Sequence, residues 1–77
     1  MTIEEMRKTE EYIKIVQKVK KYRKGFEFTL DINVIPRPQW NALRMVMRDL
    51  EKQGLIENIE FGYSIDGELV EEKYARL

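Results

Sequence analysis

The chain contains no cysteine and no histidine. Without cysteine it can form neither disulfides nor thiolate metal sites. Without histidine it lacks the usual general base and the usual zinc ligand, which excludes a serine–histidine catalytic arrangement. Paired glutamates could still do acid–base work or hold a hard cation, but those of the C-terminal third alternate along a predicted hairpin and are better explained as solvated charge. We therefore expect no enzyme activity, no metal and no cofactor.

Long apolar runs are also missing. No stretch approaches the ~20 apolar residues that a membrane-spanning helix needs. The N-terminal MTIEEMRK has acids where a secretory signal has bases. We expect a cytoplasmic protein without membrane contact, in which residues 1–77 form a single small domain.

The chain as a whole has no net charge, but its segments do. The 14 basic and 14 acidic residues cancel. Residues 1–11 and 54–77 are acidic, whereas residues 12–53 carry ten basic side chains against four acids. A local basic surface can bind phosphate in a neutral protein, although the acidic regions weaken long-range attraction.

The stretch IPRPQWNALRMVMRDLEKQGLI predicts the central helix. Pro38 suits a first helical turn, and Gly54 suits the left-handed residue just after a helix end. At ~100° per residue, Trp40 and Leu50 fall on one apolar face, together with the intervening Leu43, Val46 and Met47. The opposite face carries Arg37, Asn41, Arg44 and Arg48, which we expect to point into solvent.

The flanking segments predict the remaining elements. Thr2 and Glu5 form a capping box, so we expect one long helix over about Ile3–Lys24 that Gly25 ends. Its surplus length predicts a homodimer through this helix. Strict alternation predicts a strand at 26–30, and the room left at 31–35 allows one helical turn or irregular chain.

The C-terminal third predicts a hairpin. Asp66-Gly67 suggests a type I′ turn, for which paired residue numbers sum to 133. That register pairs Ile59 with Tyr74 and leaves Phe61 opposite Glu72, which it does not explain. The fold class is α+β, with a three-stranded antiparallel sheet. We expect these residues in the core: Ile13, Val16, Phe28, Leu30, Trp40, Leu43, Met47, Leu50, Ile56, Ile59 and Phe61.

The segment Leu50-Glu51-Lys52-Gln53-Gly54-Leu55-Ile56 resembles the end of the recognition helix in MarR-like and PadR-like winged-helix regulators. Together with Asp31-Ile32-Asn33-Val34 and Trp40, it is similar to the small YjcQ-like winged-helix proteins of bacteria and their phages. The resemblance covers residues 26–65 and implies a winged-helix-like fold whose wing is the hairpin. The chain departs from the regulators in its reduced second helix and in the acidic wing tip, Asp66 and Glu68.

Two functions are consistent with these features. The first is a DNA-binding protein, such as a phage or prophage transcription regulator, that reads double-stranded DNA with the outer face of the central helix. Arginine and asparagine can each bond base edges bidentately, and the set we expect at DNA is Arg37, Gln39, Asn41, Arg44, Arg48 and Lys52. The alternative is a non-catalytic module in which the acidic hairpin or the arginine face binds another protein, since an amphipathic helix must expose some polar face in any case.

Overall fold

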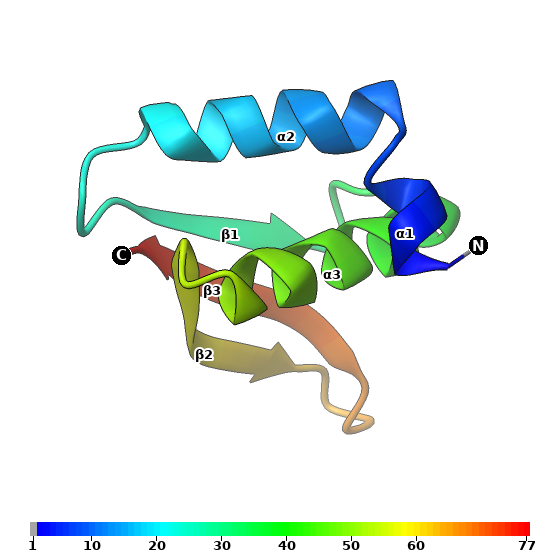
Figure 1. The fold of residues 1–77 in the computed structure, drawn as a ribbon. Coiled ribbons are helices and arrows are strands. Elements are labelled where there is room, and N and C mark those ends of the chain that lie inside the picture. Colours follow the sequence, from blue (N-terminus) through cyan, green and yellow to red (C-terminus); the bar gives the residue numbers. More distant parts are fainter. Residues whose placement is uncertain (1) are drawn as a thin grey trace.

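The computed structural model describes residues 2–77 as an α+β fold, with helices lying over one face of a three-stranded antiparallel sheet (Figure 1). The strand order is β1-β3-β2, so the last strand occupies the centre. In chain order the elements are α1 (Ile3–Met6), α2 (Glu10–Lys21), β1 (Glu27–Asp31), α3 (Arg37–Lys52), β2 (Ile56–Tyr63) and β3 (Leu69–Arg76).

The prediction of one long N-terminal helix is wrong, because residues 7–9 are not helical and separate α1 from α2. Thr9 takes an extended conformation and its hydroxyl accepts a hydrogen bond from the Tyr12 N–H, which caps a second helix. The acids at positions 10 and 11 that follow this threonine are the sequence signal for that start. Because neither helix has the surplus length that suggested a homodimer, that length no longer supports one. Self-association through residues 3–24 stays a prediction.

The central helix agrees closely with its sequence signals. Pro38 lies in its first turn, and Gly54 has a φ of 77° just beyond its end. The Leu55 N–H donates to the Leu50 carbonyl at 3.1 Å and the Gly54 N–H to the Glu51 carbonyl at 3.0 Å, which satisfies two of the last free carbonyls. Of the two alternatives for 31–35, the structure has the single turn, since the amides of Val34 and Ile35 both donate to the Asp31 carbonyl.

The hairpin forms, but its register is only partly the predicted one. The pairs that sum to 133 hold at the middle of β2, including Phe61 with Glu72. A bulge between Asn58 and Glu60 then shifts the register, so Tyr74 pairs with Asn58 and not with Ile59. The type I′ turn is also wrong: Gly67 has a positive φ, whereas Asp66 does not, and the Gly67 N–H closes the turn on the Ser64 carbonyl.

The core lies between α3 and the sheet, with α1 and α2 closing one side. Leu50 and Ile56 are completely buried, and Trp40 and Tyr74 nearly so. Three residues expected in the core are instead about half exposed: Ile13 (46%), Ile59 (46%) and Phe61 (44%). For Ile59 the physical reason is the bulge, which leaves it without a partner on β3 and interrupts the alternation of β2.

The burial of Leu50 generates a stability prediction. Leu50→Ala should lower the free energy of unfolding by ~2–5 kcal/mol, because a fully buried side chain is truncated and leaves a cavity. Ile13→Ala is the matched control and should cost much less, since Ile13 is half exposed. Urea unfolding followed by circular dichroism measures both. A loss below ~0.5 kcal/mol for Leu50→Ala, the scale of surface substitutions, would contradict this core.

Candidate interaction surfaces

The arginine face of α3 is turned toward the hairpin, where it meets acids. Arg37 forms an ion pair with Glu68 beside the hairpin tip. Arg44 donates from Nε to the Glu72 carboxylate at 2.8 Å, and Arg48 lies 3.9 Å from the same carboxylate. The expectation that these side chains all point freely into solvent is therefore wrong, most clearly for Arg44, which is half buried.

Glu72 is the reason for this arrangement. It is completely buried on β3, and a carboxylate without water is stable only when it is paired and hydrogen-bonded. Arg44 supplies the charge, and the Tyr74 hydroxyl donates a further hydrogen bond. Burial, followed by this bond to Glu72, raises the pKa of Tyr74 above its ordinary value. This accounts for the acid opposite Phe61: Glu72 lies on the side of β3 that faces the arginines of α3, and Arg44 pairs with it.

The other members of the predicted DNA-binding set take part in no ion pair with the hairpin acids. Asn41 lies between Arg37 and Arg44 on the same helical stripe and is exposed, and Lys52 is exposed at the end of the helix. Gln39 is exposed as well, but it lines a groove on the side of α3 that faces α2. Three of the six residues are thus ion-paired, two are exposed without an ion pair and one lines the groove.

A second buried carboxylate, which the sequence analysis missed, fastens α1 and α2 to α3. Asp49 is 4% exposed and accepts bonds from the Arg7 guanidinium at 2.5 and 3.0 Å and from the Tyr12 hydroxyl at 2.6 Å. The Gln53 amide donates to it at 2.9 Å. The hydrogen bond from Arg7 lowers the pKa of Asp49 to about 2, against the opposing effect of burial. The available signal was that α3 places an acid close to its apolar face.

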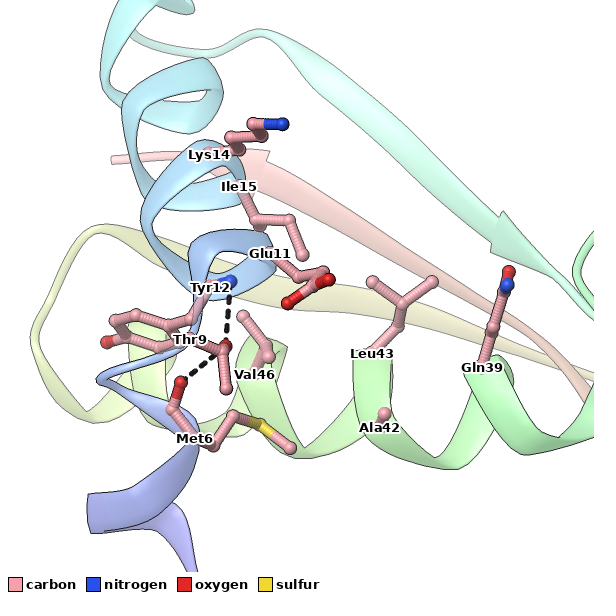
Figure 2. Close-up of a pocket in the computed structure, with 10 residues that line it drawn as sticks. All are labelled: Met6, Thr9, Glu11, Tyr12, Lys14, Ile15, Gln39, Ala42, Leu43 and Val46. Atoms are coloured by element: carbon pink, nitrogen blue, oxygen red, sulfur yellow. Dashed lines mark hydrogen bonds between the residues drawn. The ribbon is translucent and has the colours of Figure 1, made fainter.

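A groove opens between α2 and α3 (Figure 2). Its volume is about 580 Å³, and Ile15 on α2 faces Leu43 and Val46 on α3 across it. The hydroxyl of Thr9 is already occupied, because it donates to the Met6 carbonyl and accepts from the Tyr12 N–H. The groove is thus an apolar cleft with polar side chains at its rim: Glu11, Lys14 and Gln39.

The most exposed apolar side chains lie on the hairpin. Ile59, Phe61 and Tyr63 on β2 are 46%, 44% and 63% exposed, and Ile65 in the following turn is fully exposed. Phe61 and Tyr63 contact each other, with ring centroids 6.5 Å apart. Asp66 follows Ile65 in the turn. We call this set the hairpin surface; its members are Ile59, Phe61, Tyr63, Ile65 and Asp66.

Within residues 2–77, no cluster of three acidic side chains is placed to hold a metal ion. Over the same residues, no helix is both long and apolar enough to cross a bilayer.

Comparison of this chain with protein-family models, with curated proteins and with solved structures found no match.

The environment of Asp49 predicts a pH dependence. Its folded pKa of about 2 lies below the ordinary value of 3.8, so the fold stabilises the ionised form. This contribution, roughly 2 kcal/mol, is complete above the ordinary pKa and is lost as the pH falls from about 4 toward 2. Asp49→Asn should therefore be less stable than the parent at pH 7, and the difference should shrink below pH 4. Unfolding curves at a series of pH values measure it, and a difference that does not change with pH would contradict this account.

Loss of the Arg44–Glu72 pair should lower the free energy of unfolding more than loss of a surface arginine does. Arg44→Ala leaves a buried carboxylate with weaker compensation, so it should lower the free energy of unfolding by about 3 kcal/mol, the low end for breaking a buried pair. Arg48, at 3.9 Å and more exposed, retains part of the compensation. Arg48→Ala is the control and should cost less than ~1 kcal/mol. Equal thermal melts for the two variants would show that Arg44 does not hold Glu72.

Proposed function

We propose that this chain is a non-catalytic, winged-helix-like module that binds another protein through its hairpin surface. The order of helix, strand, helix and hairpin supports the winged-helix-like assignment, with the second helix of that fold reduced to the turn at 31–35. In such a layout α3 takes the place of the recognition helix and the β2–β3 hairpin takes the place of the wing.

The exposure of the hairpin surface is the observation that carries the proposal. Small monomeric proteins rarely expose a contiguous set of large apolar side chains, and such a set with a polar border is typical of a protein interface. Here Phe61, Tyr63 and Ile65 are exposed within five residues of sequence, although a chain of 77 residues has few apolar side chains to spare from its core. Aromatic side chains of this kind are common binding hot spots.

The border of the hairpin surface defines the chemistry of the partner. Asp66, next to Ile65 in the turn, favours a partner whose apolar patch is bordered by lysine or arginine, because complementary charge guides association and excludes wrong partners. β2 is an edge strand, but bulges near Ile59 and Tyr63 interrupt its ladder. Bulges hinder the addition of another strand, so we expect the partner to contact side chains and not to extend the sheet.

Duplex DNA is the second candidate. The position of α3 before the hairpin supports it, as does the exposure of Asn41, Arg48 and Lys52 on that helix. The ion pairs of Arg37 and Arg44 weigh against it, because an arginine that neutralises Glu68 or Glu72 is not free to bond a guanine. The acidic hairpin tip would also repel the phosphates that a wing usually contacts.

Site-specific photo-cross-linking tests the protein-binding proposal. Tyr63 is replaced by the photoreactive p-benzoylphenylalanine, which resembles it in shape, in the cells that naturally make this protein. A discrete adduct heavier than the chain should form on irradiation, because Tyr63 is exposed within the hairpin surface. The same residue placed at Glu4, which is exposed on α1, should give no such adduct.

A second substitution makes the result specific. Phe61→Ala combined with Asp66→Lys should remove most of the adduct, since Phe61 contacts Tyr63 and like charges facing each other at an interface are strongly unfavourable. The circular dichroism spectrum and melting temperature of the purified variant show whether it is folded. Adducts of equal yield at positions 4 and 63, or a yield that the two substitutions leave unchanged, would exclude the hairpin surface as the docking site.

A further inference from the structure

Eleven of the 14 lysines and arginines of this chain fall into two groups that behave differently. The arginines of α3 pair with acids of the hairpin, Arg7 pairs with Asp49, and Lys73 pairs with Glu27. Six other cations lie within the eleven residues from Lys14 on α2 to Lys24 just after it. All six are exposed, and among residues 2–77 none of them takes part in an ion pair: Lys14, Lys18, Lys20, Lys21, Arg23 and Lys24.

These cations are arranged on the outer side of a regular helix. Tyr12 and Val19 are buried and define the inner side of α2. At ~100° per residue, Lys14, Lys18 and Lys21 form a row on the opposite side, which spans ~10 Å of helix axis. Figure 1 shows α2 running along an edge of the molecule with its outer side uncovered. The acids of α2 are confined to its first turn, Glu10 and Glu11, so beyond Tyr12 a single sign of charge covers this side of the helix.

We infer that this lysine row is a binding surface for the phosphate backbone of double-stranded nucleic acid. The inference is independent of the hairpin surface and uses residues that the arginine face of α3 does not contain. Lysine ammonium groups bind phosphate as point charges, and such contacts carry affinity without reading bases. The surface therefore provides sequence-independent binding, in which each neutralised phosphate releases counterions.

The apolar side of α2 argues against an anionic membrane as the ligand. A helix that lies in a bilayer interface inserts its apolar face among the lipids. In this fold that face carries Tyr12 and Val19, which are buried against the rest of the domain, and Tyr22 packs on Phe26 and Phe28 with centroids 4.4 and 5.3 Å apart. Only the charged side of α2 is available, and a rigid array of phosphates matches it.

Binding of a fluorescent 20-base-pair DNA duplex of random sequence, followed by anisotropy, tests the inference. Three phosphate contacts alone contribute a log–log salt slope of about −2.7, which is a loss of roughly 40-fold in affinity between 50 and 200 mM salt. The test variant carries Lys14→Gln, Lys18→Gln and Lys21→Gln. It should bind at least about tenfold more weakly at 50 mM salt, and its slope should be smaller by about two to three.

The control variant carries Lys8→Glu and Asn33→Asp, at two exposed positions outside α2 and α3, so that both variants have the same net charge. It should keep the affinity and slope of the parent. Replacement of the three α2 lysines by arginine should keep them as well, because the charge stays. Melting curves establish that all variants are folded, which glutamine permits as a good helix former.

Four results would overturn the inference. The parent could fail to bind the duplex, or the test and control variants could lose affinity equally, which would reflect net charge alone. A loss of affinity in the control variant only would place the contact outside α2. Vesicles of anionic phosphatidylserine bound as tightly as the duplex would identify a membrane surface. None of these results bears on the adduct at Tyr63, so the two proposals fail separately.

Discussion

The constraint on which the rest of this structure depends is the burial of Glu72. A carboxylate removed from water on the central strand must be given a partner of opposite charge, and Arg44 is the residue that reaches it. The Arg44–Glu72 pair joins α3 to β3, and it turns the polar side of the helix toward the hairpin. Arg37 follows on the same side and pairs with Glu68. A face that would otherwise be available to a ligand is used to hold the domain together.

Asp49 places a similar constraint on the other side of α3. It accepts hydrogen bonds from Arg7 in the turn after α1, from Tyr12 on α2 and from Gln53 at the end of α3. A domain of this size has a small apolar core, so directional contacts between buried polar groups specify how its elements are placed. The two carboxylates thus fix α3 between the hairpin on one side and the N-terminal helices on the other.

The pairing of charges also determines which surfaces remain available. The arginines of α3 are largely neutralised by acids of the hairpin, while no ion pair among residues 2–77 includes a member of the lysine row of α2. The exposed apolar side chains are concentrated on β2 and the turn that follows. These two surfaces differ in chemistry, since one suits phosphate and the other suits an apolar patch with a basic border. A chain whose net charge is zero can therefore present both.

The sequence by itself determined the elements whose signals are local. Pro38 and Gly54 mark the limits of α3, the alternation of residues 26–30 marks β1, and the period of the apolar residues places Leu50 in the core. These features follow from backbone dihedrals and from side-chain periodicity, which involve residues close together in the chain. The resemblance to winged-helix proteins rests on the same local signals.

Only the tertiary structure decided how the polar side chains are used. Arg44 and Glu72 are 28 residues apart, and Arg7 and Asp49 are 42 apart, so neither pair has a local signature. The bulge next to Ile59 depends on the register in which β2 pairs with β3, and it moves that residue out of the core. A helical period shows that a face is polar, but whether that face meets water, a ligand or a buried acid depends on which distant element packs against it.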